Sequence, residues 1–313
     1  MLKSHKFVNW LIFWVLTLLW ASAYAFTRMA VSKDAPQFGF PAYVIIPARV
    51  SIGAVILLII VQLSGQKWPA LSDWRKYLTM AVLGIVGTAM PFFVITSAQE
   101  TVDSSLAALY VAAAPLFVGV VAHFIFTDER ISAQKGVGLV VGFSGVAVLF
   151  GRDAIAAFGT ATVTAQALLL LGTALYAVAT ITARFGKDIP PLIFATGFVT
   201  IAALVSWPML FLADLSALNP SREAIVGVIG LGLGPTAAAS ILYMVLIART
   251  SATFLSLTGY TIPIVSIIIG FIAFGEVRHW TAFFAFGLIL LGVWLAQRNT
   301  QSAKEPIGET HLQ

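Results

Sequence analysis

The fold is decided by residues 41–63, which read PAYVIIPARVSIGAVILLIIVQL. The run is apolar almost throughout, and Arg49 is its single charged residue. About 20 consecutive apolar residues form a helix long enough to cross a hydrocarbon core of about 30 Å. The stretch therefore predicts a membrane-spanning helix with one charge inside it.

Nine further runs of the same kind flank this stretch. Together the expected spans are residues 7–29, 41–63, 77–98, 104–126, 134–150, 164–184, 190–213, 223–247, 251–274 and 279–297. The 313 residues are 59% hydrophobic and 10% charged, whereas a soluble domain carries roughly 25% charged residues. The sequence predicts an all-α integral membrane protein with ten transmembrane helices and short loops.

Composition also excludes several kinds of chemistry. The chain has no cysteine, so disulfides, thiolate catalysis and cysteine metal sites are ruled out. Its net charge of +5 comes from single basic residues in loops, so the lipid bilayer is the expected partner and nucleic acid is not. The glycines of residues 230–234 lie inside a span, with no strand before them and no P-loop lysine. We expect neither a nucleotide site nor any cofactor.

The basic residues also predict an orientation. With the N-terminus inside, twelve lysines and arginines fall in cytoplasmic segments and five in outer loops, as the positive-inside rule expects. Both termini are then cytoplasmic, and residues 298–313 form a polar tail. An alternative is a signal peptide cleaved near Ala21-Ser22-Ala23. The apolar run continues through Phe26, which favours a retained helix.

An internal repeat divides the chain into residues 1–150 and 151–297. The matching positions are Leu83-Gly84 with Leu231-Gly232, Thr88-Ala89 with Thr236-Ala237, Pro115 with Pro263, and Glu129 with Glu276. Five spans per repeat is an odd number, so the second repeat enters the membrane from the opposite side. Inverted repeats are typical of secondary transporters, whose substrate site lies near the midplane between the halves.

In its motifs the sequence resembles the drug/metabolite transporter superfamily, in the ten-helix form with two EamA repeats. The residues that carry the resemblance are Leu19-Trp20-Ala21-Ser22, Arg49, Leu83-Gly84 to Thr88, Pro115, Glu129-Arg130, Gly232 to Thr236, Pro263, Gly275-Glu276 and Gly292. The resemblance covers residues 9–297, with Ala21 and Ala285 at places where the family pattern has glycine. It implies a permease or exporter of amino acids, other metabolites or drugs in the cell inner membrane, and no enzyme.

Two residues inside the spans could carry charge. An unpaired arginine at the centre of a membrane helix costs about 2.5–3.5 kcal/mol, so Arg49 is expected to face protein, water or an anionic group. It could hold a substrate carboxylate or a gating ion pair, or it could lie near the outer surface and bond helix-end carbonyls. His123 could relay protons, or it could be a neutral histidine bonded to a nearby carbonyl.

Aromatic and hydroxyl side chains are the other candidates for substrate binding. The set is Trp20, Ser22, Tyr24, Tyr110, Tyr176, Thr180, Tyr243, Ser256 and Tyr260. Several of them lie four residues apart and so share a helix face, where they could stack on a metabolite and bond its polar end. They could equally belong to lipid-facing belts or plain packing. Pro115 and Pro263 are candidate hinges, because proline frees a backbone carbonyl within a helix.

The carboxylates all fall in loops, at span ends or in the tail. A buried acid is what a proton-coupled pump for cations commonly needs, so its absence from the spans favours a neutral or zwitterionic substrate, a facilitator, or coupling at His123. We expect Glu129 and Glu276 to form ion pairs at helix ends with the nearby Arg130 and Arg278.

The leading hypothesis is a secondary transporter that exports amino acids or related metabolites by alternating access. A multidrug antiporter and a membrane-embedded enzyme are the alternatives, although no convergent catalytic constellation is visible for the latter. We expect eight spans to line the cavity, the fifth and tenth to be peripheral, and Arg49 to be the main charged lining residue. The expected partners are a small-molecule substrate and, as a further candidate, a second copy of the chain in a homodimer.

Overall fold

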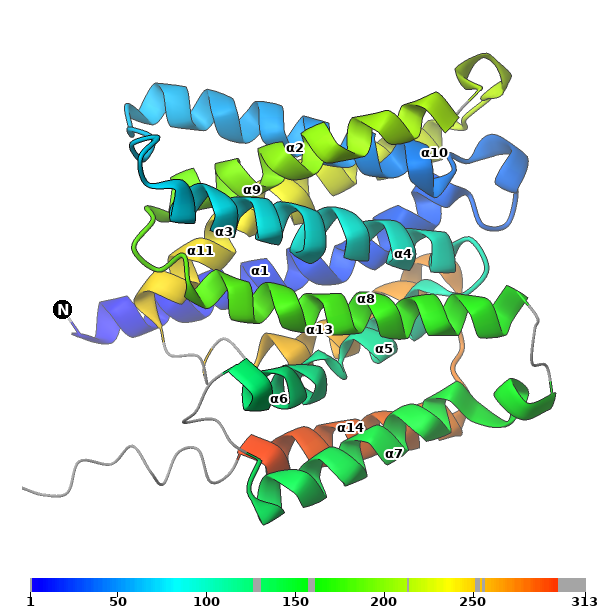
Figure 1. Ribbon diagram of the computed structural model, residues 1–313. Helices are drawn as coiled ribbons and strands as arrows, with labels where there is room; N and C mark the ends of the chain where they lie inside the picture. Colours follow the sequence, from blue (N-terminus) through cyan, green and yellow to red (C-terminus); the bar gives the residue numbers. More distant parts are fainter. Residues whose placement is uncertain are drawn as a thin grey trace, which may run out of the picture.

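The computed structural model describes residues 2–125, 131–156, 161–212, 214–250, 254 and 257–297, and every regular element in these ranges is helical (Figure 1). The α-helices are α1 (Leu2–Val31), α2 (Ala42–Ser64), α3 (Trp74–Gly84), α4 (Met90–Gln99), α5 (Ser104–Val111), α6 (Ala114–Ile125), α7 (Ala133–Ala156), α8 (Ala161–Arg184), α9 (Pro191–Ser206), α10 (Arg222–Leu231), α11 (Ala239–Arg249), α13 (Thr258–Phe274) and α14 (Trp280–Gln297). Shorter turns are η1 (Pro36–Phe38), η2 (Ile85–Ala89), η3 (Trp207–Leu212), η4 (Leu215–Ala217) and η5 (Gly232–Ala238).

Seven helical segments are long and apolar enough to cross a membrane, and three shorter ones are also apolar. The short segments are Ala133–Leu149, Thr258–Phe274 and Trp280–Ala296. All of them overlap the spans expected from the sequence. Large apolar side chains such as Phe211 and Leu63 are exposed on the outside of the bundle, as they are in proteins that face lipid. The expectation of an all-helical membrane protein is confirmed.

Two helices are each interrupted by a π-helical turn. The turn η2 separates α3 from α4, and η5 separates α10 from α11. In the first, the Thr88 hydroxyl donates a hydrogen bond to the Leu83 carbonyl oxygen, 3.0 Å away. In the second, Pro235 removes a backbone donor from the turn. Single π-turns in helices are frequent at functional sites, and both of these border the cavity described below.

The two proline spans differ from each other. Helix α13 continues through Pro263, whereas α5 ends at Val111 and α6 begins at Ala114, just before Pro115. Between α5 and α6, the Ala113 amide bonds the Tyr110 carbonyl oxygen in a tight turn. Proline therefore starts a new helix in the first half and is accommodated within one in the second.

Helices α7 and α14 pack against each other at one edge of the bundle, where Figure 1 draws them below the other helices. Glycines form the contact. A Cβ added at Gly292 would lie 2.3 Å from the Cα of Gly142, and one at Gly138 would lie 2.5 Å from the backbone nitrogen of Ala296. Small residues allow such close approach of helices in membranes. These two spans were expected to be peripheral. They lie at the edge of the bundle, but Lys135 of α7 and Ala296 of α14 also line the cavity described below, so the expectation holds only in part.

Candidate functional site

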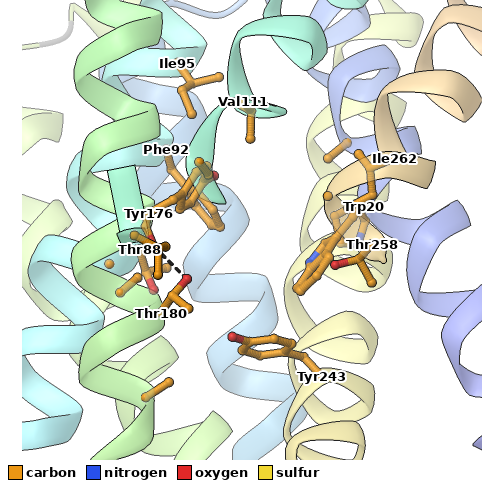
Figure 2. A pocket seen from close by; sticks show the side chains of 18 of the residues that line it. Trp20, Thr88, Phe92, Ile95, Val111, Tyr176, Thr180, Tyr243, Thr258 and Ile262 are labelled. Carbon is orange, nitrogen blue, oxygen red and sulfur yellow. Dashed lines mark hydrogen bonds between the residues drawn. The ribbon is translucent and has the colours of Figure 1, made fainter. Parts of the chain in front are cut away.

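A cavity of about 820 Å³ occupies the middle of the bundle. Most of its wall comes from α1, α2, α4, α5, α6, α8, α11, α13 and both π-turns, and single residues of α3, α7, α9 and α14 complete it. In Figure 2, Tyr176, Thr180 and Thr88 lie on one side of the space, and Trp20, Thr258 and Ile262 lie on the other. Ligand-binding pockets typically measure 300–1,000 Å³, so the space suits a small metabolite.

Arg49 is the one charged residue in the middle of this cavity wall. It comes from α2, its residue exposure is 4%, and its Nε and Nη2 atoms donate to the Thr236 hydroxyl at 3.2 and 3.1 Å. The guanidinium carbon lies 3.9 Å from the centre of the Phe92 ring. Thr236 belongs to η5 and Phe92 to α4, so Arg49 joins elements from both halves of the chain.

The surroundings of Arg49 offset only part of the cost of burying it. A cation over an aromatic face is worth about 2 kcal/mol when desolvated, and a hydrogen bond to a charged group about 1.5–3 kcal/mol. A guanidinium has five N–H donors, and within the described part of the chain both of its hydrogen bonds go to one hydroxyl. No carboxylate of the described residues forms an ion pair with it. The site therefore lacks an anion that a ligand could supply.

An aromatic pair faces this region from the other side. The rings of Trp20 on α1 and Tyr243 on α11 lie 5.1 Å apart in a tilted arrangement (Figure 2). On α8, the Thr180 hydroxyl donates to the Tyr176 carbonyl oxygen at 2.9 Å, the bond dashed in Figure 2. Tyr24 of α1 also lines the space. These side chains offer aromatic faces and hydroxyl groups to a bound molecule.

The candidate residues from the sequence divide into two groups. The structure places Trp20, Tyr24, Arg49, Tyr176, Thr180, Tyr243, Pro115 and Pro263 on the cavity wall. Three others lie elsewhere. Ser22 turns back to donate to the Leu19 carbonyl oxygen, Tyr110 is fully buried in the core, and Tyr260 packs against that core. Ser256 lies outside the described residues.

His123 is not part of the described cavity wall. Its Nδ1 atom accepts a hydrogen bond from the Ile131 amide at 3.0 Å, which links the end of α6 to the segment before α7. One alternative from the sequence was a hydrogen bond from this histidine to a nearby carbonyl, in which the ring would donate. The structure has the ring accepting instead, which requires an unprotonated Nδ1.

Three further cations lie at one end of the cavity. Lys135 of α7, Arg184 at the end of α8 and Lys187 after it all line the wall, and Lys187 is exposed. The cavity therefore opens at this end. Arg49 was expected to be the main charged residue of the cavity lining. That expectation was wrong, because these three cations had been counted among the charges of the cytoplasmic loops and span ends. One feature of the sequence could have drawn attention to the loop after α8. Its residues Lys187-Asp188-Ile189-Pro190 have the same Lys-Asp-X-Pro pattern as Lys33-Asp34-Ala35-Pro36 in the loop after α1.

A cluster of ion pairs lies at the end of the bundle opposite these cations. Its central contact joins Arg28 of α1 to Glu276, which follows α13, at 2.9 Å. Arg28 also pairs with Asp34 and Asp103, and Asp103 pairs with Lys33 and Arg278. The carboxylate of Glu276 further accepts bonds from the backbone and hydroxyl groups of Ser104 and Ser105.

We call these residues, Arg28, Lys33, Asp34, Asp103, Ser104, Ser105, Glu276 and Arg278, the ion-pair cluster. Glu276 was expected to pair with Arg278, and the structure instead gives Glu276 to Arg28 and Arg278 to Asp103. Glu129 and Arg130, the corresponding pair of the first half, lie outside the described residues. Glu276 takes the place of an N-cap for α5, whose first amides would otherwise be unsatisfied.

The cluster lowers the pKa of Asp103 and of Glu276. Partial burial raises the pKa of Asp103, but hydrogen bonds and charge attraction from Lys33 and Arg278 outweigh it and hold the pKa at about 2. Burial also acts to raise the pKa of Glu276, and the bonds from Ser105 and Ser104 bring it below its usual value. Glu100 lacks such partners: burial raises its pKa, against a single bond from the Ala42 amide.

In the ranges that the structure describes, no group of three histidine, cysteine or acidic residues could hold a metal ion. The polar groups of the cavity are hydroxyls, amides and cations. Their chemistry is recognition of a molecule by hydrogen bonding, stacking and charge.

A bundle of apolar helices around a large central cavity is typical of membrane transporters. The sequence model of the EamA-like transporter family matches residues 9–151 and again residues 163–297. The chain therefore belongs to this family, with two EamA repeats that cover it. The expected resemblance is confirmed.

Relatives with similar sequences carry transporter names. An uncharacterized transporter of Archaeoglobus fulgidus is 23% identical over 93% of this chain and 99% of its own. The uncharacterized inner membrane transporter YedA of Escherichia coli K12 is 26% identical over 90% of this chain and 87% of its own. A protein of Streptantibioticus cattleyicolor named "Probable terminal-alkyne amino-acid exporter" is 26% identical over 96% of both chains.

A solved crystal structure shares the fold. It superimposes with a TM-score of 0.65 at 20% identity and covers 95% of this chain and 99% of its own. At this identity the similarity concerns the arrangement of helices alone.

Proposed function

We propose that this chain is a secondary transporter that exports small carboxylate-bearing metabolites, a class that comprises amino acids and related compounds, by alternating access. In this proposal it has ten transmembrane helices arranged as two inverted repeats, residues 1–150 and 151–297. The cavity around Arg49 is the substrate site, and it is reached from one side of the membrane at a time.

The pairing of helices supports inverted repeats. If the five spans of each half correspond in order, α2 corresponds to α9 and α7 to α14, and each of these pairs is in contact. Helix α1 packs on α10, and α8, which corresponds to α1, packs on α3, which corresponds to α10. The π-turns η2 and η5 fall at corresponding places. A twofold relation between the halves accounts for all of these contacts.

The observation that carries the substrate class is the environment of Arg49. It is buried, bonded to one hydroxyl, stacked on Phe92 and without a carboxylate partner among the described residues. A carboxylate fits a guanidinium through two parallel hydrogen bonds, and the bound substrate would complete the charge balance. The name of the Streptantibioticus cattleyicolor relative supports amino acids within this class.

The position of the opening is consistent with the proposed export. Lys135, Arg184 and Lys187 surround the opening, and the positive-inside rule places them in the cytoplasm. The cavity then loads from the cytoplasm while the ion-pair cluster closes the outer end. Both termini lie in the cytoplasm in this arrangement, with residues 298–313 as the tail. The name of YedA supports the inner membrane as the location.

A multidrug antiporter for cations is the alternative function. The lining of the cavity works against it, since a cationic drug would approach Arg49 without any carboxylate of the described wall to offset the repulsion. His123, the residue that could have coupled protons, is not on the described wall. A homodimer stays a prediction from the sequence.

The test is uptake into proteoliposomes of labelled amino acids, aromatic amines and cationic dyes, with and without a pH gradient. Native protein is compared with Arg49→Ala and with Arg75→Ala, which removes an exposed arginine far from the cavity. We expect saturable flux of carboxylates that Arg49→Ala lowers at least about tenfold and Arg75→Ala leaves unchanged. Flux of cations alone that is indifferent to Arg49 would overturn the proposal.

A further inference from the structure

The charge of the cavity wall is one-sided. Arg49, Lys135, Arg184 and Lys187 line it, and among the described lining residues there is no aspartate or glutamate. The nearest acids at the closed end are engaged elsewhere. Asp103 and Glu276 belong to the ion-pair cluster, and Glu100 accepts a hydrogen bond from the Ala42 amide at 2.9 Å. Any molecule in the cavity therefore meets cations and neutral groups.

This wall treats the two ends of a zwitterion differently. The carboxylate of an amino acid can pair with Arg49, but its ammonium is attached one carbon away and must then lie within several ångströms of the same guanidinium. Like charges at such distances repel strongly where water is excluded. The aromatic face next to Arg49 is that of Phe92, and the guanidinium of Arg49 already occupies it, so this face cannot also hold the ammonium.

The uncharged part of the wall suits an apolar body. Trp20 and Tyr243 form an aromatic pair across from Arg49, and Ile95, Val111 and Ile262 continue the apolar lining (Figure 2). Gln99 also lines the cavity but is 1% exposed, and its Oε1 atom makes no hydrogen bond within the described residues. The wall thus offers stacking and neutral hydrogen-bond acceptors, Gln99 Oε1 among them, but no carboxylate of the described lining to balance the charge of an ammonium.

We infer that the preferred substrates are net anions, namely monocarboxylates with an aromatic or branched apolar body in which the amino group is absent, acylated or replaced by hydroxyl or keto oxygen. This inference rests on the proposed function and narrows its substrate class. Zwitterionic amino acids of the same shape are poorer substrates, and the corresponding amines are excluded.

The cations at the opening of the cavity also favour anions over zwitterions and cations, before a substrate reaches Arg49. Arg184 lies eight residues after Tyr176 on α8, a rise of about 12 Å along the helix axis. A ring of positive charge at the opening raises the local concentration of anions and speeds their binding, an effect that salt weakens. An anion therefore passes from the charges of Arg184 and Lys187 to that of Arg49.

The test uses four molecules with one aromatic body: phenylalanine, 3-phenyllactate, N-acetylphenylalanine and phenethylamine. Their net charges at pH 7.5 are zero, minus one, minus one and plus one, as the pKa values of carboxyl and amino groups dictate. Uptake of each is measured in proteoliposomes clamped at zero membrane potential, with native protein and Arg49→Ala. We expect kcat/KM for the two anions to exceed that for phenylalanine at least about tenfold, with no uptake of the amine.

Each other outcome has a defined meaning. Arg49-dependent uptake of phenylalanine as fast as that of 3-phenyllactate would overturn this inference and leave the proposed function standing. Failure of every carboxylate, with protein that still unfolds cooperatively by tryptophan fluorescence, would overturn both. Uptake of phenethylamine alone would overturn both in favour of a cation transporter.

A second pair of variants tests the opening independently. Lys187→Gln combined with Arg184→Gln should lower the rate for 3-phenyllactate about three- to tenfold at low salt and flatten its dependence on ionic strength. Lys67→Gln, which removes an exposed lysine from the loop after α2, is the matched control and should leave both unchanged. An unaltered salt dependence in the double variant would contradict a role for these cations in anion capture.

Discussion

Nη1 of Arg28 lies 2.9 Å from Oε1 of Glu276, although 248 residues separate them in the chain. The contact ties the end of α1 to the segment after α13, and through Ser104 and Ser105 it also holds the start of α5. Glu276 is almost fully buried, with 2% of its side chain exposed. A buried ion pair costs much to break from one side, because the remaining charge is left without a partner. The contact thus keeps this end of the cavity closed.

Replacing Glu276 by Gln should shift the protein toward a conformation open at the ion-pair cluster. The chain has no cysteine, so a single Thr96→Cys, in the cavity wall on the α4 side, reports accessibility. We expect labelling by a membrane-impermeant maleimide applied from the cluster side to rise at least about fivefold. The control is Asp34→Asn, because Asp34 is 81% exposed and its pair with Arg28 is worth little. Equal labelling in the Glu276 variant and the parent would show that the contact does not govern closure.

The ion-pair cluster should make stability depend on pH only in strong acid. The pKa of Asp103 in the folded protein is about 2, below its ordinary value of 3.8. An acid with a lowered pKa stabilises the fold above its ordinary pKa, and this contribution is lost as the pH falls toward the lowered value. The difference in unfolding free energy between native protein and Asp103→Asn should therefore be constant from pH 5 to 8. It should shrink between about pH 4 and pH 2.

For this partly exposed group we expect the difference to be about 1 kcal/mol, after allowance for screening by water. Thermal unfolding in detergent at several pH values measures it. Glu100→Gln is an internal check with the opposite sign, since burial raises the pKa of Glu100 and its protonation stabilises the fold at low pH. A difference for Asp103→Asn that varied across pH 5 to 8 would contradict the lowered pKa.

The glycine contact between α7 and α14 should not tolerate even one methyl group. In Gly292→Ala the new Cβ would lie 2.3 Å from the backbone of Gly142, which cannot move aside as a flexible side chain could. Overpacking of this kind costs about 1–3 kcal/mol or more. Gly287→Ala on the same helix is the matched control, because nothing lies within 4 Å of its added Cβ. Thermal unfolding in detergent should separate the two variants by several degrees, and equal midpoints would refute the close contact.

Removing the Thr236 hydroxyl should weaken substrate binding while sparing the charge of Arg49. In Thr236→Val the guanidinium loses the acceptor of both its hydrogen bonds and becomes free to reorient. We expect KM to rise about three- to tenfold, a smaller effect than that of Arg49→Ala, because only part of the roughly 1.5–3 kcal/mol of a charged hydrogen bond is lost from substrate binding. Thr79→Val, at an exposed site on α3, serves as the comparison. An unchanged KM in Thr236→Val would show that the hydroxyl does not position Arg49.

The membrane-spanning segments could be predicted because lipid imposes a length and an apolar composition that the sequence displays directly. Arg49 stood out for the same reason, as a charge within such a segment. The partner of Glu276 could not be predicted, because Arg28 and Arg278 are both arginines that could pair with it. Only the packing of α1 against α13 decides between them.

The same limit applies within single spans. Tyr110 and Tyr176 look alike in the sequence, yet the first is fully buried in the core and the second lines the cavity. Which face of a uniformly apolar helix turns inward depends on its neighbours, and the hydropathy pattern carries little of that information. Lys135 and Arg184 lie at the ends of expected spans and Lys187 follows one, so all three were counted as cytoplasmic charges. Their place at the opening depends on where the helix ends converge.

The π-turns η2 and η5 give each half of the bundle a point where a helix is already wider than the α-helical repeat. Bending there breaks fewer backbone hydrogen bonds than bending elsewhere, because the regular i to i−4 series is already interrupted. Thr88 and Thr236, the corresponding threonines of the two turns, both have hydroxyls engaged, one with its own backbone and one with Arg49. Arg49 is therefore bonded to the turn at which the helix of the second half bends most easily. Binding of a ligand at Arg49 and bending of this helix are then coupled.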